Sequence, residues 1–128
     1  MTISKEDANY VAGIFDGEGC YSWGTEMRPR LRVGMTNKDP VLFLKNCLFI
    51  GKYYEQNHKS GKIYYQYILS RKEDVALFFQ LIGPYLKLKT IDNPANKKDV
   101  DPDRLKEFIE YVKNSNFSLI PQYQAEKI

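Results

Sequence analysis

One carboxylate stands between two glycines at the end of an apolar run, in the order Gly17, Glu18, Gly19. The apolar pattern of residues 10–16 predicts a helix, which places Glu18 at a helix C-terminus. The helix dipole is negative there, so an acid is unfavourable unless a cation lies nearby. Paired carboxylates with divalent metal ions serve in-line phosphodiester hydrolysis. Glu18 is therefore a candidate metal-binding catalytic residue, and the alternative is a polar C-cap before a strand.

Two glycines within this run need a structural reason, because glycine inside a helix costs roughly 1 kcal/mol relative to alanine. Gly13 and Gly17 lie one turn apart on the same helix face. Small residues at this spacing let a second helix approach closely. Two such helices packed side by side would bring two Glu18 carboxylates together.

The same stretch resembles the nine-residue signature of the LAGLIDADG homing endonucleases. Its residues are Val11, Ala12, Gly13, Ile14, Phe15, Asp16, Gly17, Glu18 and Gly19. Residues 49–51, 67–70 and 84–89 look like the later landmarks of single-motif members, in the same order. The resemblance covers roughly residues 8–112, and the sequence has no second copy of the signature.

The resemblance implies a sequence-specific endonuclease of double-stranded DNA that acts in intron or intein homing. It also implies a homodimer whose signature helices pack at a twofold axis. The interface would include Val11, Ala12, Gly13, Asp16 and Gly17. The sequence supports a dimer independently, because each chain has one Glu18 and a double-strand cut needs two sites. A dimer in turn predicts a nearly palindromic target.

The resemblance also implies roles in catalysis. Glu18 and the backbone carbonyl near Gly17 would hold a divalent cation, with Mg²⁺ the natural choice and Mn²⁺ or Ca²⁺ as substitutes. Lys89 takes the place of the family's active-site lysine beside the scissile phosphate, and Lys87 is its rival. Asn37 falls where single-motif relatives often carry a glutamine that positions water.

The sequence departs from the family pattern at Pro40 and Val41, where a further basic residue is common, and its first hairpin is shorter. Asp16 is expected to cap or bridge near the helix end rather than to bind metal. Two alternatives stay open: an intron RNA-binding splicing cofactor (maturase), and a DNA-binding protein of the same fold that does not cleave. Glu18 favours the nuclease, because a pure binder has no need for a carboxylate facing phosphate.

Periodicity and capping signals place the elements that would position these residues. Helices are expected at residues 5–17, 41–49, 72–82 and 103–113, strands at 20–26, 30–36, 52–57 and 62–69, turns at 27–29 and 58–61, and a loop at 93–99. The expected N-caps are Ser4, Asp39, Ser70 in a capping box with Glu73, and Asp101. This order predicts an α+β fold with helices on one face of an antiparallel sheet.

Alternation within the strands gives the sheet a second, polar face. In the strand at 30–36, Leu31, Val33 and Met35 point to a core while arginines point outward, and Ile63 has the buried parity of its own strand. A concave β surface fits the major groove, where arginine suits guanine and glutamine suits adenine. The residues expected to bind DNA are Ser22, Glu26, Arg28, Arg30, Arg32, Gln56, His58, Lys62, Tyr64, Gln66 and Ile68.

The composition fits one domain in a chain of 128 residues, expected at residues 1–113, with a C-terminal tail at 114–128 that packs loosely or is disordered. The net charge of +3 is modest, but basic residues outnumber acids in the predicted strands. There is no apolar run of about 18 residues and no signal-like N-terminus. We therefore expect an intracellular protein without a membrane partner, in an organelle, a bacterium or a phage-infected cytoplasm. Cys20 and Cys47 lack metal-type spacing.

Overall fold

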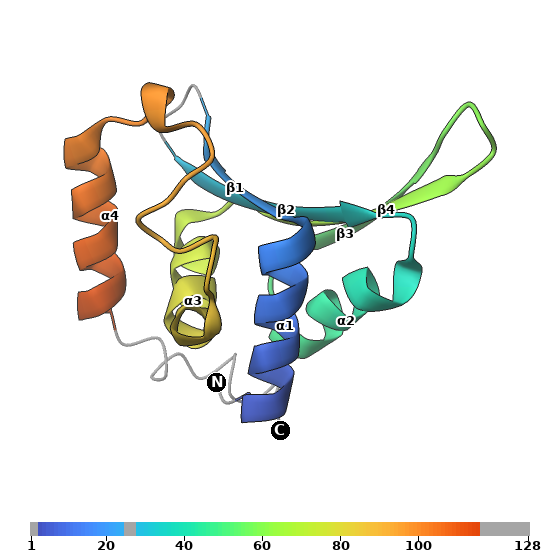
Figure 1. Ribbon diagram of the computed structural model, residues 1–128, viewed down its shortest axis with the longest axis horizontal. Coiled ribbons are helices and arrows are strands. Elements are labelled where there is room, and N and C mark those ends of the chain that lie inside the picture. The colour runs from blue at the N-terminus through green and yellow to red at the C-terminus, as the bar shows by residue number, and fades with distance from the viewer. Residues whose placement is uncertain (1–2, 25–27, 116–128) are drawn as a thin grey trace.

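A computed structural model describes residues 3–24 and 28–115 (Figure 1). Its helices are α1 (Lys5–Glu18), α2 (Lys38–Leu48), α3 (Lys72–Ile82) and α4 (Pro102–Asn114). Its strands are β1 (Gly19–Trp23), β2 (Pro29–Met35), β3 (Lys52–Asn57) and β4 (Ile63–Leu69), and two 3₁₀ turns are η1 (Gly83–Tyr85) and η2 (Lys97–Asp99). The element order confirms the α+β fold expected from the sequence.

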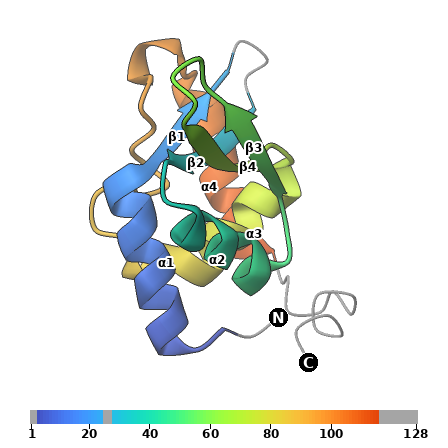
Figure 2. The same cartoon turned by 90° about the vertical axis from the view of Figure 1, so that its right-hand side faces the viewer.

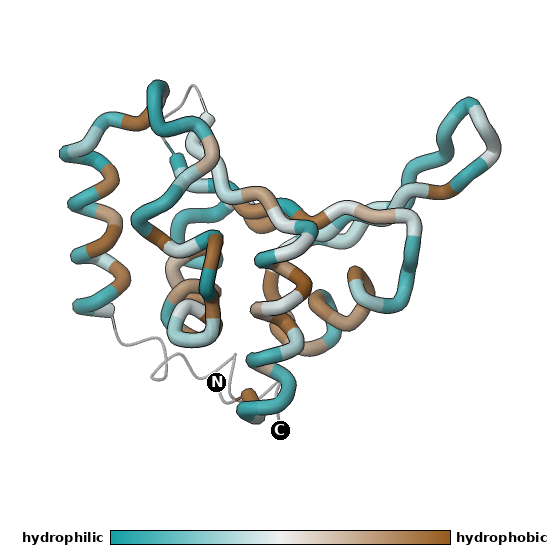
Figure 3. The backbone as a smooth tube through the Cα atoms, viewed as in Figure 1, coloured by the Kyte–Doolittle hydropathy of each residue, from teal (hydrophilic) through white to brown (hydrophobic). Residues whose placement is uncertain are grey.

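The described strands form one four-stranded antiparallel sheet in the order β1-β2-β4-β3. The edges of the sheet are therefore β1 and β3. Helices α1, α2 and α3 lie against one face, α4 packs outside α3, and the other face is free (Figures 1 and 2). The tube coloured by hydropathy shows apolar residues along the helix faces that turn towards the sheet (Figure 3).

The core lies between the sheet and the helices, as alternation in the strands predicts. In β2, Leu31 and Val33 are buried while the arginines between them are exposed. Leu31 pairs with Leu69 of β4, which is also fully buried. Beneath them the rings of Phe15 in α1 and Phe78 in α3 lie 5.0 Å apart. Burial of such side chains is the main source of stability in a domain of this size.

The β3–β4 hairpin extends past the layer of helices (Figure 1). Its turn is where the sequence predicts it: Gly61 has φ of 84° and its N–H donates to the carbonyl of His58. Ile63 lies in this overhang and is 40% exposed. The expectation that Ile63 is buried is therefore wrong, because its face of the strand is not covered by a helix there.

Two helix N-caps differ from the expected ones. Asn37, not Asp39, caps α2: its Oδ1 accepts a hydrogen bond from the Asp39 N–H at 3.3 Å, and the helix starts at Lys38. The capping box of Ser70 is absent, because Arg71 is the N-cap of α3 and makes no side-chain cap bond. The caps Ser4 and Asp101 are confirmed, each accepting a backbone N–H in the first turn.

Several boundaries also shift. Strand β1 ends at Trp23, which pairs with Pro29, so Pro29 belongs to β2 rather than to the turn. Glu26 lies outside the described residues, as does the predicted tail from residue 116 onward. The segment 93–99 includes the short turn η2. Among the described residues, no helix is long and apolar enough to cross a membrane.

Candidate active site and nucleic-acid interface

Helix α1 passes into strand β1 without a loop, and this junction carries Glu18. Glu18 is the last helical residue and is exposed, and the N–H of Gly19 caps the helix by donating to the Phe15 carbonyl. A Cβ on Gly19 would lie 2.6 Å from Cε1 of the Phe15 ring. Position 19 therefore needs glycine because a core ring lies against it. The junction fixes the Glu18 backbone at the edge of the sheet.

Asp16 holds the chain segment after η1 against the end of α1. Its carboxylate accepts backbone N–H bonds from Lys87 at 2.8 Å, Leu88 at 3.1 Å and Lys89 at 3.0 Å. Burial raises the pKa of Asp16, but these three bonds and the Lys89 charge outweigh it and leave the pKa below its usual value. The expectation that Asp16 bridges near the helix end is confirmed.

This bridge brings Lys89 to the junction. The Lys89 Nζ donates to the backbone carbonyl of Gly19 at 2.6 Å, one residue from Glu18. The rival residue, Lys87, has an exposed side chain and bonds to Asp16 through its backbone N–H. An ammonium group from a distant part of the chain thus lies at the backbone of the residue that follows Glu18, at one edge of the sheet.

The donor set at this junction is small. Among the described residues, no three His, Cys, Asp or Glu side chains gather into a group able to hold a metal ion. One chain offers the Glu18 carboxylate and main-chain carbonyls at the end of α1. Mg²⁺ keeps several waters and is commonly bound by one or two carboxylates together with substrate phosphates. The residues present fit that kind of site.

Asn37 is exposed in the segment between β2 and α2, four residues beyond Val33, the strand partner of Gly19. Its side-chain oxygen is engaged in capping α2. The structure therefore gives Asn37 a local structural task, and its role towards water stays a prediction.

The residues expected at the dimer interface lie on two different faces of α1. Val11 and Ala12 are 0% and 2% exposed within the chain's own core, so they are wrong as interface residues. The helical repeat places them on the side that meets the sheet. Gly13 and Gly17 lie on the exposed side, where a Cβ at either would meet nothing within 4 Å among the residues that the structure describes. The carboxylate of Asp16 is bound within its own chain.

The predicted polar residues gather on the free face of the sheet. Cross-strand partners there are Ser22 with Arg30, Arg32 with Ile68, and Gln56 with Tyr64, and Gln66 lies opposite Gly34. Exposed members of the set are Arg28, Arg30, Arg32, Gln56, His58 and Lys62, while Ser22, Tyr64, Gln66 and Ile68 are half-buried. The register confirms that the strand residues Ser22, Arg30, Arg32, Gln56, Tyr64, Gln66 and Ile68 share this face. Arg28, His58 and Lys62 lie outside the paired residues, so their place on this face stays a prediction, as does every contact with DNA.

Two residues of this face were missed in the sequence. Lys52 pairs with Ile68 and Tyr54 pairs with Gln66, so both belong to the free face, and Tyr54 is 42% exposed. The signal was present, since alternation back from Gln56 reaches both residues. The loop at 93–99 was expected from the sequence, but its basic residues were given no role; it is described below.

The comparisons with known proteins find a match in fold but none among family models or curated proteins. No protein-family model matches the chain, and no curated protein matches it. Among solved structures, the homing endonuclease I-CvuI in complex with the I-CreI target in the presence of Mg is 17% identical, with a TM-score of 0.55 over 86% of this chain and 69% of that chain. The same enzyme with its target Sro1.3 in the presence of Ca is 18% identical, with a TM-score of 0.54 over 88% and 87%.

A second protein gives the same result. The archaeal intron-encoded homing endonuclease I-Vdi141I complexed with DNA is 15% identical, with a TM-score of 0.55 over 84% of this chain and 67% of that chain. Identities this low show the fold alone. This chain therefore has the α+β fold of the homing endonucleases. Its residues 11–19 resemble the LAGLIDADG signature of that class.

Proposed function

We propose that this protein is a homodimeric, divalent-metal-dependent endonuclease that cuts double-stranded DNA at a nearly palindromic homing site. One observation carries the proposal: the Lys89 ammonium donates to the carbonyl of Gly19, the residue that follows Glu18 in the chain. Both groups stand at the edge of a sheet whose free face is basic. The structures of I-CvuI and I-Vdi141I, which share this fold, are homing endonucleases in complex with DNA.

In the proposed site, Glu18 and main-chain carbonyls near Gly17 hold the divalent cation, Mg²⁺ or a substitute such as Mn²⁺ or Ca²⁺. When bound, the ion supplies charge stabilisation at the phosphate and activates water for in-line attack. Lys89 adds a positive charge beside the phosphate. Because its ammonium is already bound to Gly19, little side-chain freedom is lost when DNA arrives. No side chain is needed as a nucleophile.

The proposed dimer uses the exposed side of α1. Within residues 3–24 and 28–115, a Cβ at Gly13 or Gly17 would meet nothing within 4 Å, so packing in this part of the chain does not require glycine there. Close approach of a second α1 would use both glycines and bring two Glu18 carboxylates together. Each carboxylate would then serve one DNA strand.

Recognition is assigned to the free face of the sheet. Arg30 and Arg32 are exposed on the central strand β2 and suit guanine O6 and N7 or phosphate. Gln66, opposite Gly34 on the same face, suits adenine. The twist of the sheet matches this surface to the major groove.

A cleavage-inactive DNA-binding protein is the second candidate, favoured by one specific observation. Val41 occupies a position where relatives often carry a basic residue, and it is fully buried in the core. The neighbouring candidate Asn37 is engaged as a helix cap. The chemistry would then depend on Glu18 and Lys89 without help from this region.

Cleavage of supercoiled DNA that carries the intronless host sequence tests the proposal. Wild-type protein with Mg²⁺ should produce one double-strand cut, Glu18→Gln should abolish it, and Glu107→Gln, a matched change on exposed α4, should leave it unchanged. Sedimentation of the DNA complex should show two chains. Specific binding without cutting in Mg²⁺ or Mn²⁺ would support the second candidate, and equal cutting by Glu18→Gln would refute the assigned site. Specific binding to intron RNA without DNA cutting would identify a splicing cofactor.

A further inference from the structure

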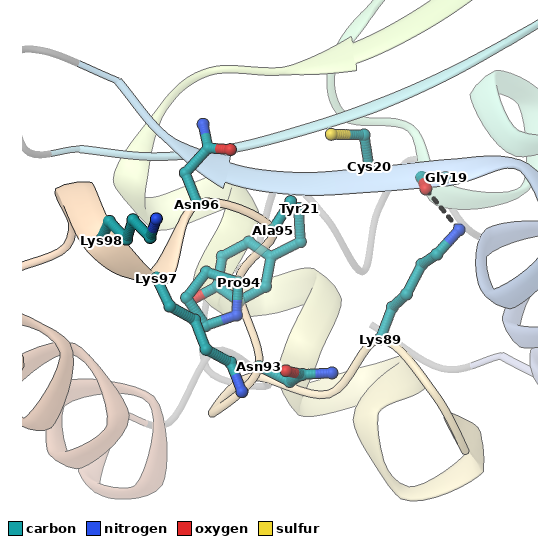
Figure 4. A pocket seen from close by; sticks show the side chains of 10 residues that line it. All are labelled: Gly19, Cys20, Tyr21, Lys89, Asn93, Pro94, Ala95, Asn96, Lys97 and Lys98. Carbon is teal, nitrogen blue, oxygen red and sulfur yellow. Dashed lines mark hydrogen bonds between the residues drawn. The ribbon is translucent and has the colours of Figure 1, made fainter.

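A hollow of about 620 Å³ opens along the edge of β1, beside the Lys89 junction (Figure 4). We call it the β1-edge hollow. Strand β1 forms one wall and the loop after Lys89 forms the other. It is lined by Gly19, Cys20, Tyr21, Lys89, Asn93, Pro94, Ala95, Asn96, Lys97 and Lys98.

The loop that forms the outer wall is fixed to the body of the protein at both ends. At its start, Asp16 holds the backbone of residues 87–89. At its far end, the N–H of Ala95 donates to the Tyr21 carbonyl at 2.7 Å, which occupies part of the open edge of β1. The wall is therefore a built feature of the edge rather than a free loop.

Hydrogen bonds within the loop also set its shape. Asn93 donates through its backbone N–H to the Thr90 carbonyl at 2.9 Å and through its side chain to the Leu88 carbonyl at 3.0 Å. The Thr90 hydroxyl donates to Asp92 at 2.6 Å. The turn η2 then presents Lys97 and Lys98, and it stands beside the sheet at the β1 edge (Figures 1 and 2).

The hollow combines an apolar floor with a basic rim. Tyr21 and Pro94 are buried and form apolar floor, while Lys97 and Lys98 are exposed. Among the described side chains, neither of these lysines forms an ion pair within 4.0 Å of a carboxylate. The pKa of Asp92 is lowered mainly by the hydrogen bond from Thr90, and the nearby positive charge of Lys97 lowers it further. Two cations thus face solvent next to the site of Lys89.

We propose that the β1-edge hollow binds the sugar-phosphate backbone of DNA next to the cut phosphate, with Lys97 and Lys98 as phosphate ligands. This inference rests on the proposed function, because Lys89 fixes where the cut phosphate lies. A sugar ring suits the apolar floor, and flanking phosphates suit the ammonium groups on the rim. Contacts of this kind position DNA without reading its sequence. They would add affinity along the β1 edge of the sheet.

The salt dependence of DNA binding tests the proposal without requiring cleavage. The variant Lys97→Ala/Lys98→Ala is compared with Lys106→Ala/Lys113→Ala, which removes the same charge from exposed positions of α4. Binding is measured in Ca²⁺ on a duplex with the homing site and on a random-sequence duplex of equal length. Thermal unfolding of both variants checks that each is folded.

We expect the hollow variant to lower the slope of log K against log salt by about 2 and to weaken binding to both duplexes about tenfold or more. The α4 variant should change neither by a comparable amount. The wild type and the α4 variant should protect the DNA backbone next to the cut site, and the hollow variant should lose this protection.

Equal slopes for the wild type and the hollow variant would overturn the inference and leave the proposed function intact. Equal losses in both double variants would also overturn it, because they would show a general charge effect. If the wild type bound neither duplex, the proposed function and this inference would fail together. If Glu18→Gln abolishes cutting while the hollow variant binds with the wild-type salt slope, the proposed function stands and this inference alone fails.

Discussion

The two hairpins of the sheet are built in opposite ways. In the β1–β2 hairpin, the edge strand β1 is covered by the loop that Asp16 and Tyr21 hold in place. The β3–β4 end extends past the helices and exposes 42% of Tyr54 and 40% of Ile63. The start of β1, which we call the fixed end, carries Glu18 and Lys89, whose proposed roles need exact geometry. The projecting end offers reach and side chains that can adapt to a groove, so catalysis and recognition are expected to respond differently to mutation.

The largest expected effect is on catalysis at the fixed end. Lys89→Met should lower the cleavage rate about 10² to 10³-fold with little change in DNA affinity, because it removes charge stabilisation at the phosphate. The matched change Lys62→Met, at the projecting hairpin, should weaken binding and leave the rate on bound DNA unchanged. Single-turnover cleavage with saturating protein measures the two effects. Equal rate losses in both variants would contradict the division between the ends.

The next effect is on stability. Leu69→Ala should lower the free energy of unfolding by about 3 kcal/mol, because Leu69 is fully buried. Ile63→Ala, on the same face of the same strand, should cost less than about 1 kcal/mol, because no helix covers it. Urea unfolding of both variants gives the comparison. A large loss in Ile63→Ala would mean that the hairpin packs against something in solution.

Asp16→Asn tests the bridge that fixes the loop. It should cost about 1 to 2 kcal/mol of unfolding free energy, since charged acceptors of backbone N–H bonds are the stronger ones. The folded-state pKa of Asp16 lies below its usual value of 3.8, so its contribution is present above about pH 4 and is lost as the pH falls through the folded value. Unfolding measured from pH 7 to pH 2 should show the gap between wild type and variant closing at acid pH. The matched change Asp39→Asn, on an exposed carboxylate, should leave the pH profile as it is in the wild type.

The smallest effect concerns sequence preference at the projecting end. A Cβ on Gly34 would lie 2.8 Å from ring carbons of Tyr64. The centroid of the Tyr64 ring also lies 5.6 Å from that of the His58 ring. Gly34→Ala should therefore tilt Tyr64, change stability by less than about 1 kcal/mol and alter base preference in the half-site. Selection from randomised duplexes measures that preference. Gly24→Ala, where a Cβ meets nothing within 4 Å, serves as the control, and identical preferences in both variants would exclude a role for Tyr64.

Local pattern predicted much of this molecule. The alternation in β2 identified its arginine face, and the bounds of β3 and α3 were correct because glycine turn signals flank them closely. The glycines predicted the end of α1 to within one residue, at Gly17 rather than Glu18. These features depend on neighbours within a few residues, which periodicity can represent.

The features that sequence missed depend on distant contacts. The position of Lys89 relies on hydrogen bonds to Asp16 that span more than seventy residues, and the family resemblance, not periodicity, identified it. The basic loop has no period because it takes its shape from Tyr21 and Asp16. Alternation along β4 placed Ile63 on the correct face of the sheet, but it could not show that the helices do not reach that position. Val11 and Ala12 were assigned to a partner because a signature does not distinguish the two sides of its helix.

The direct passage from α1 into β1 leaves no hinge between the Glu18 backbone and the sheet to which DNA recognition is assigned. In the proposed dimer, the distance between the two cutting groups and the distance between the two reading surfaces are then set by a single rigid piece. Inserting one base pair at the centre of the target would separate the half-sites by about 3.4 Å and rotate one against the other. The protein has no joint at this point to absorb that change, so we expect it to measure the length of its site as strictly as it reads the sequence.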